Sequence, residues 1–286
     1  MAQTYSNGLS EVILGKAIKQ LQLPREEIVI LTKVYFTVAR EYETSMSTSR
    51  GDPDQNGYVN QHGLSRKHIF DSVKASLARL GVDYIDVLQC HRFDYKTPID
   101  ETMQALHDVV KAGYVRYLGM SSCHAYQFHQ MQNYAITHNL TPFISMQNHH
   151  NLLYREEERE MFPTLKLFGV GAIPWSPLAR GLLTRPKEEQ TKRGATDWFN
   201  NRYLEALGTP EIIKRVEELA NKKGLSMAQI AVMWSLSKEG VTAPIVGTTS
   251  MKNLEQLIDV ANMKLNQEEM KYLEEAYVAQ AVLGHL

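Results

Sequence analysis

The alternation of short apolar runs with amphipathic segments constrains the fold of this 286-residue chain more than any other feature. One such run begins at Ile85, is partly β-branched, and stops at His91. Runs of this length and composition are typical of strands that are buried in a parallel sheet. The pattern predicts six strands, over 28–34, from 85 up to His91, and over 115–121, 143–148, 170–175 and 243–247.

Helical periodicity occupies the segments between these runs. Ser65 is a suitable N-cap for one such helix, and Gly81 is a suitable end for it. The predicted helices lie between Ser10 and Pro24 and over 65–81, 97–113, 126–138, 156–168, 210–223, 227–239, 252–261 and 267–279. Each predicted strand is therefore followed by at least one helix.

Right-handed βα units in series either close into a barrel or spread as an open doubly wound sheet. The glycine fingerprint of a dinucleotide-binding doubly wound sheet, G-x-G-x-x-G, does not follow the first predicted strand. We therefore expect an α/β fold of the TIM type, a (β/α)8 barrel, as a single domain over residues 1–286.

Composition excludes several classes of protein. A net charge of −1 gives no electrostatic reason to expect nucleic acid or an anionic membrane as a partner. The two cysteines, Cys90 and Cys123, fall at predicted strand ends, so a disulfide framework is disfavoured. No apolar run approaches the roughly 20 residues of a membrane span, and the N-terminus lacks the pattern of a signal peptide. We expect a cytoplasmic protein.

Polar residues gather where the predicted strands end. In a parallel barrel these ends share one face, so side chains that are far apart in the sequence converge on one pocket. Taken singly, Lys33 is also consistent with an exposed lysine, and Trp175 with a core residue. The loop 247–250 is more specific, because a Gly/Ser/Thr-rich start of a helix presents free N–H groups to a phosphate. The converging positions are Lys33, His91, Ser121, Ser122, Gln147, Trp175, Ser176 and 247–250.

Several motifs, in their order and spacing, resemble those of the aldo-keto reductases over nearly the whole chain. They are Tyr5–Glu11 with Leu14–Ala17, Thr32–Val34, Gln89–Asp94, Arg116–Ser121, Gln147–Asn148, Trp175–Thr184 and Ile245–Ser250. The resemblance implies hydride transfer between NADPH and a carbonyl compound, in which Tyr5 is the general acid. It also implies that Lys33 lowers the pKa of the tyrosine and that His91 orients or relays a proton to the carbonyl oxygen. A free tyrosine has a pKa of about 10, so a neighbouring ammonium would help it to act near neutral pH.

The resemblance further implies a set of residues that bind the cofactor. Trp175 would stack on the nicotinamide, and its carboxamide would bind Ser121, Ser122 and Gln147. The pyrophosphate would lie along Ser176, Leu178, Gly181 and Leu183, with Arg193 as a further phosphate contact. The adenosine phosphate would bind Gly247, Thr249, Ser250, Lys252 and Gln256. Asn253 and Leu257 stand where the family often carries other residues, so the preference for NADPH over NADH needs a comparison of Kd values.

The chain departs from the family pattern at its beginning. The family places an aspartate shortly before the tyrosine, and here that position lies before Met1. The family's first hairpin, first strand and helix, and most of its second strand are likewise missing. We therefore expect a truncated barrel of about six strands, in which the strand over 28–34 has an unpaired edge. Such an edge favours a homodimer more than a complete barrel would.

Two functions follow from these features. The first is an NADPH-dependent reductase of aldehydes or ketones, with an aryl carbonyl compound favoured by aromatic residues. Its substrate choice would lie in the long loop 36–63 and near Phe93 and Trp198. The second is a nucleotide-binding sensor or regulatory protein with impaired catalysis, since the aspartate and the first strands are missing. A barrel hydrolase is disfavoured, because neither a nucleophile with a base partner nor a metal-ligand cluster is apparent, and we expect no metal.

Overall fold

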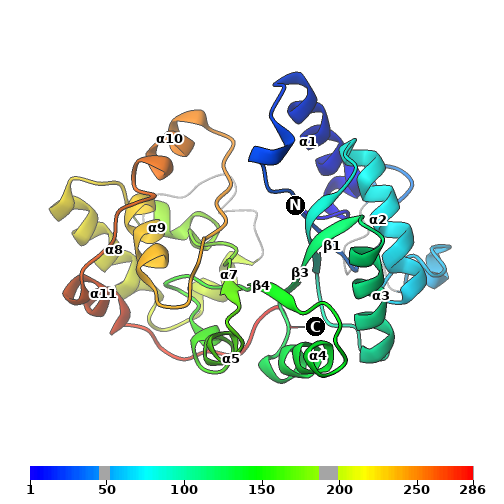
Figure 1. Ribbon diagram of the computed structural model, residues 1–286. Helices are drawn as coiled ribbons and strands as arrows, with labels where there is room; N and C mark the ends of the chain where they lie inside the picture. The colour runs from blue at the N-terminus through cyan, green and yellow to red at the C-terminus, as the bar shows by residue number, and fades with distance from the viewer. Residues whose placement is uncertain (45–51, 187–198, 286) are drawn as a thin grey trace. The chain divides into compact units, whose positions relative to one another are not determined.

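The structure is a computed structural model that describes residues 1–44, 52–186 and 199–285 (Figure 1). The chain forms two compact units, one of residues 1–145 with His285, and the other Met146–Gly284. Arg193 and Trp198, and part of the loop 36–63, lie outside the described residues. A single domain over 1–286 stays a prediction.

Five parallel strands form one sheet, in the order β1-β2-β3-β4-β5. The strands are β1 (Leu31–Val34), β2 (Ile85–Cys90), β3 (Val115–Ser121), β4 (Phe143–Gln147) and β5 (Gly171–Ala172). In the register, Leu31 pairs with Val87, and Ile85 pairs with Val115. Most side chains of β2 are buried, which explains why a nearly continuous apolar run predicted it. The α/β class and the parallel sheet are confirmed.

The last two predicted strands were wrong in extent. β5 is shorter than the predicted strand over 170–175, and 243–247 forms no continuous ladder. The chain there makes isolated parallel bridges, which pair Ala172 with Val241 and Trp175 with Ile245. Pro174 has no N–H to donate to the facing segment, and this interrupts the ladder between the two segments.

The helices of the first unit pack against one another in chain order. They are α1 (Leu9–Gln20), α2 (Arg66–Leu80), α3 (Ile99–Lys111) and α4 (Ala125–Thr137), with short 3-10 turns at Tyr5–Gly8, Arg25–Glu27 and Asp54–Asn56. Figure 1 shows α2 and α3 side by side next to β1 and β3. As predicted, the Ser65 hydroxyl accepts a hydrogen bond from the N–H of His68, and Gly81 ends α2 in the left-handed conformation.

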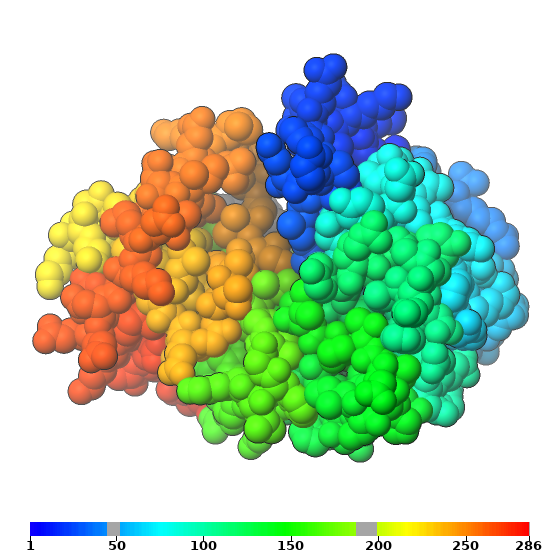
Figure 2. Space-filling view, viewed as in Figure 1, coloured from blue at the N-terminus to red at the C-terminus, as the bar shows by residue number. Residues whose placement is uncertain are grey.

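The second unit is built mainly from helices. These are α5 (Met161–Phe168), α7 (Asn200–Leu204), α8 (Thr209–Lys223), α9 (Met227–Ser237), α10 (Met251–Asp259) and α11 (Gln267–Glu274), with 3-10 turns at Glu156–Glu158 and Ala179–Thr184. Its core includes Tyr154, Tyr203 and Trp234, all completely buried. The yellow α8 and the orange-red α11 lie side by side on the surface of this unit (Figure 2).

Two predicted helices of the second unit were too long. The helix predicted over 156–168 is a 3-10 turn followed by α5, because Pro163 cannot donate a backbone hydrogen bond and is tolerated only in a first helical turn. The helix predicted over 267–279 ends at Glu274. Beyond it, the chain makes hydrogen bonds to another segment instead, such as that from the Gln280 side chain to the Leu153 carbonyl, 2.6 Å long.

The N-terminal residues lie along the edge of β1 that was expected to be unpaired. The nitrogen of Met1 donates to the Leu31 carbonyl at 3.1 Å, and the N–H of Gln3 donates to the Lys33 carbonyl at 3.3 Å. Residues 1–3 therefore cover part of this edge, and a homodimer through it stays a prediction. Within the described residues, no helix has both the length and the apolarity that crossing a membrane requires.

Candidate active site

The structure brings together the three predicted catalytic residues in the first unit. Lys33 lies near the end of β1, and His91 follows β2, where its N–H donates to the Val34 carbonyl at 2.9 Å. Tyr5 begins the 3-10 turn that precedes α1. The Lys33 Nζ lies 5.3 Å from the centroid of the Tyr5 ring, and the Tyr5 and His91 ring centroids are 5.8 Å apart. One residue from each of three segments therefore meets at the carboxyl ends of β1 and β2.

Lys33 is a buried cation. Lys33 is only 3% exposed, and its Nζ donates a hydrogen bond to the Met1 carbonyl at 2.8 Å. Burial, with a smaller contribution from the cation of Arg92, lowers the pKa of Lys33 to about 8. No carboxylate of the described residues pairs with it.

His91 and Tyr5 both favour their neutral forms. Burial, and then the charges of Lys33 and Arg92, lower the pKa of His91 to about 2. A neutral imidazole can donate one hydrogen bond but cannot supply a proton readily near neutral pH. Burial raises the pKa of the Tyr5 hydroxyl, while Arg92 opposes that rise. The hydroxyl of Tyr5 therefore keeps the proton that a general acid must give.

Arg92 and Phe36 belong to this cluster, although neither was predicted. The Phe36 ring meets the His91 ring edge to face, with the centroids 5.0 Å apart, and the Arg92 Cζ lies 5.8 Å from the Phe36 centroid. The one signal in the sequence was that Arg92 directly follows His91.

Ser121 and Ser122 lie at the end of β3, close in register to His91. Cys90, the last residue of β2, pairs with Met120. Both serines are buried, and Ser122 has a φ of 34°, in the left-handed region that non-glycine residues seldom adopt. This conformation turns the chain sharply at the edge where the predicted site lies.

Gln147 and Trp175 lie in the second unit, Gln147 at the end of a strand and Trp175 in isolated bridges beyond β5. Gln147 ends β4, and the N–H of Trp175 donates to the Asn148 carbonyl at 2.8 Å. The indole of Trp175 stacks on the imidazole of His149, with the centroids 4.2 Å apart and the planes 9° from parallel. One face of the predicted nicotinamide platform is therefore fixed by a histidine that sequence reasoning missed.

A cavity of about 710 Å³ in the second unit gathers many of the predicted cofactor residues. Arg180 and Arg185 also line it, which the sequence did not reveal. Six of the predicted residues line the cavity, namely Ser176, Leu178, Gly181, Gly247, Thr249 and Gln256.

The other predicted cofactor residues have different places. Leu183 is completely buried in the core. Ser250 is the N-cap of α10, where its hydroxyl accepts from the N–H of Asn253 at 3.4 Å, and Lys252 is exposed in the first turn. None of these three is among the residues that line the cavity, and Arg193 lies outside the described residues.

The lining of this cavity fits the phosphate end of a dinucleotide. A Cβ built on Gly247 would meet nothing within 4 Å, so the backbone there is open to close approach. The Nε of Arg185 is buried and makes no hydrogen bond within the described parts of the chain. Guanidinium groups, hydroxyls and free backbone N–H groups are the donors that phosphates prefer in proteins.

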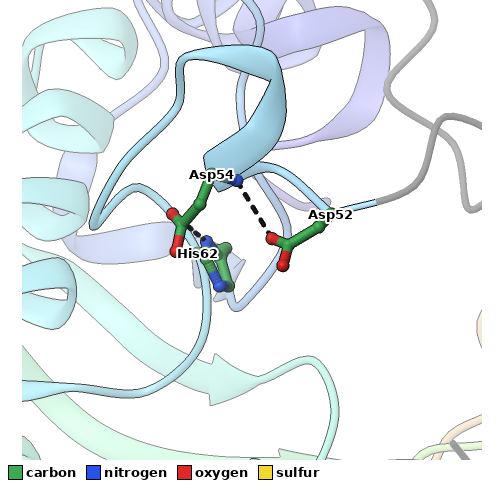
Figure 3. A group of neighbouring side chains, drawn as sticks. All are labelled: Asp52, Asp54 and His62. Carbon is green, nitrogen blue, oxygen red and sulfur yellow. Dashed lines mark hydrogen bonds and ion pairs between the residues drawn. The ribbon is translucent and has the colours of Figure 1, made fainter.

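Asp52, Asp54 and His62 form a surface group whose ligand atoms lie within 4.8 Å of one another (Figure 3). The Asp54 N–H donates to Asp52 at 3.0 Å, and the His62 Nδ1 lies 3.7 Å from the Asp54 carboxylate. The side chain of Asp54 is 50% exposed, and exposed acidic groups of this kind are common without an ion. We assign no metal to this group.

Known proteins resemble this chain over most of its length. A model of the aldo/keto reductase family matches residues 1–278. A putative aryl-alcohol dehydrogenase of Schizosaccharomyces pombe is 48% identical, over 100% of this chain and 82% of that protein. The versiconal hemiacetal acetate reductase of Aspergillus parasiticus is 48% identical, over 98% of this chain and 82% of that protein. An aldo-keto reductase of Fusarium vanettenii is 45% identical, over 99% of this chain and 78% of that protein.

Proposed function

Because the chain belongs to the aldo/keto reductase family, we propose that it reduces an aldehyde or ketone to an alcohol with a nicotinamide cofactor, NADPH. Membership confirms the resemblance seen in the sequence and the barrel fold class. The observation that carries the proposal is the meeting of Tyr5, Lys33 and His91 at the ends of two neighbouring strands. Relatives named as reductases support carbonyl reduction as the reaction.

In this proposal, each residue of the cluster has one task. NADPH, when bound, supplies the hydride. The Tyr5 hydroxyl gives its proton to the carbonyl oxygen, and the ammonium of Lys33 stabilises the phenolate that remains. The neutral imidazole of His91 donates a hydrogen bond that orients the same oxygen. Lys33 and His91 are buried, so the charge of Lys33 acts on its neighbours more strongly than it would in water.

NADPH rather than NADH is the finer part of the proposal. Arg180 and Arg185 line the cavity of the second unit, and a 2′-phosphate carries charge that a guanidinium binds well. Trp175 would stack on the nicotinamide, with the carboxamide bound by Gln147. Measured Kd values for both cofactors test this preference, and tighter binding of NADH would overturn it.

An aryl carbonyl compound is the proposed substrate. Phe36 lies beside His91, and the rings of Phe93 and Tyr95 meet edge to face at 5.1 Å, close to the same strand end in sequence. Aromatic side chains favour flat apolar ligands. A relative named as an aryl-alcohol dehydrogenase points to the same class of compound.

The experiment mixes the full chain with NADPH and a panel of aromatic and aliphatic aldehydes and follows the absorbance of the cofactor. We expect turnover of aryl aldehydes, with aliphatic aldehydes slower. Isothermal titration with NADPH measures binding separately. Tight NADPH binding without turnover on any aldehyde would refute the catalytic proposal.

That outcome would favour the second candidate, a nucleotide-binding sensor or regulatory protein. Its support is that Lys33 bonds to a carbonyl oxygen and not to a carboxylate in the described part of the chain. Tyr5→Phe separates the candidates. In a reductase this substitution removes most of the turnover, whereas in a sensor it leaves the function, which is NADPH binding, unchanged.

A further inference from the structure

We propose that Arg92 binds a carboxylate group of the substrate, so that this enzyme prefers aryl carbonyl compounds that carry a carboxylate. The inference rests on the proposed function, because it names the substrate class of the same site. Arg92 would contribute to specificity, while Tyr5 and its partners act on the carbonyl group.

The position of Arg92 places a cation beside the reacting groups. It follows His91 directly, and its Nη1 donates to the His91 carbonyl at 2.6 Å. Its Cζ lies 5.8 Å from the Phe36 ring, which itself contacts the His91 ring. One nitrogen of the guanidinium is thus anchored to the backbone, which limits how far the group can move.

The charge of Arg92 is not neutralised by the protein. Across the described ranges, no carboxylate lies within ion-pair distance of it, and its Nε is buried without a hydrogen-bond partner. Asp94, two residues further along, is used elsewhere. Its carboxylate accepts from the N–H of Leu64 at 2.6 Å, the N–H of Lys96 at 2.9 Å and the hydroxyl of Thr97 at 2.7 Å.

A half-buried cation of this kind favours an anionic ligand. Arginine stays charged at all ordinary pH values, and an unpaired, partly desolvated charge costs free energy that an anion would offset. The site also holds Lys33, so two cations lie near Tyr5 and His91. Burial lowers the pKa of Arg92, with the nearby phenol groups of Tyr5 and Tyr35 opposing this.

The geometry favours a ligand in which an aromatic ring carries a carboxylate group. A guanidinium binds a carboxylate through hydrogen bonds from its nitrogens, and within the described residues the Nε of Arg92 makes none. Phe36 and Tyr35 meet edge to face, with centroids 5.0 Å apart, beside the same cation. An aryl ring with a carboxylate would therefore meet both an apolar surface and its counter-charge.

The test compares 4-carboxybenzaldehyde with methyl 4-formylbenzoate, its neutral ester, using NADPH and the full chain. We expect the wild-type protein to prefer the carboxylate in kcat/KM. Arg92→Gln should lower kcat/KM for the carboxylate by about tenfold or more, equivalent to ~1.4 kcal/mol, chiefly through KM. Arg92 also shifts the pKa values of Tyr5, Lys33 and His91, so kcat/KM for the ester falls as well, but the ratio of the carboxylate value to the ester value should drop by about tenfold.

Two further variants control for charge and for folding. Arg92→Lys keeps the charge but loses the paired hydrogen bonds, so its kcat/KM for the carboxylate should fall between wild type and Arg92→Gln. Arg116→Gln removes an exposed arginine near the start of β3, at the opposite end of the strands from His91, and should change neither substrate. Thermal unfolding of each variant shows whether it is folded.

Outcomes for the inference and for the proposed function differ. The inference would be overturned if Arg92→Gln lowered kcat/KM equally for both aldehydes, or if the wild-type protein did not prefer the carboxylate. In either case, turnover of the ester would still show that the protein is a reductase. If neither aldehyde turns over, the proposed function fails, and calorimetric titration with benzoate and benzamide decides the inference alone. Benzoate binding that exceeds that of benzamide and is lost in Arg92→Gln supports it, whereas equal binding of the two contradicts it.

Discussion

Lys33→Met should make the protein more stable near neutral pH while removing its activity. Methionine keeps an unbranched apolar stem and removes the buried charge. The pKa of Lys33 falls from its ordinary value of 10.5 to about 8, which at 1.36 kcal/mol per pH unit is a penalty of about 3 kcal/mol. The lost hydrogen bond to the Met1 carbonyl offsets about 1 kcal/mol of the gain. The free energy of unfolding should therefore rise by about 2 kcal/mol.

The gain in the free energy of unfolding of Lys33→Met over wild type should decrease as the pH rises. Below about pH 8 the folded and unfolded chains both hold the proton of Lys33, so the wild-type protein bears the full penalty. Between about pH 8 and 10.5 the unfolded chain binds more protons, and wild-type stability from this group rises with pH. The advantage of Lys33→Met should therefore shrink across this window and be gone above it.

Urea unfolding of both proteins at several pH values between about 7 and 10 measures this difference. Lys74→Met is the matched control, because Lys74 is an exposed lysine of α2, and its effect should be equally small at each pH. A gain for Lys33→Met that does not change with pH would refute the reasoning, as would a variant that is less stable than wild type near neutral pH.

Two further predictions concern buried carboxylates. Burial raises the pKa of Glu157 to about 8, although the Asn148 side chain donates a hydrogen bond to its carboxylate at 2.7 Å. Between pH 4.5 and about 8 the folded chain binds more protons than the unfolded chain, so the free energy of unfolding of the wild-type protein should fall as the pH rises through this range. Glu157→Gln should reduce this fall, and equal falls in both proteins on urea unfolding would contradict the prediction. Arg79→Met should lower the free energy of unfolding by about 3–5 kcal/mol, because it leaves the fully buried Glu11, 2.7 Å from Arg79, without its cation; a loss under about 1 kcal/mol would count against this.

The sequence predicted β2 and β3 and the helices of the first unit well, because local patterns encode them, whereas β1 begins at Leu31 and is shorter than the strand predicted over 28–34. β2 and β3 are buried apolar runs, and Ser65 and Gly81 mark the ends of α2. Other errors arose where proline removes a donor. Pro174 interrupts a ladder that an apolar run alone would favour.

The places of polar residues at strand ends could be predicted from the sequence, whereas contacts between distant residues could not. Lys33 and His91 were found by position. The role of Arg92 was not, since nothing in the sequence shows that Asp94 bonds to Leu64 and Thr97 and leaves the guanidinium without an acid. The pairing of residues 1–3 with β1 was missed as well, because it uses backbone groups that carry no side-chain pattern.

The most direct test of the proposed reaction follows deuterium from the cofactor. Wild-type protein and Tyr5→Phe are each mixed with an aryl aldehyde and NADPH that carries deuterium at both C4 positions of the nicotinamide, and the alcohol is analysed by mass spectrometry. We expect wild type to yield alcohol with one deuterium on the former carbonyl carbon, and Tyr5→Phe to form it at least about a hundredfold more slowly with unchanged NADPH binding. Unlabelled alcohol, or equal rates for the two proteins, would contradict the assignment of Tyr5 and its neighbours as the reductase site.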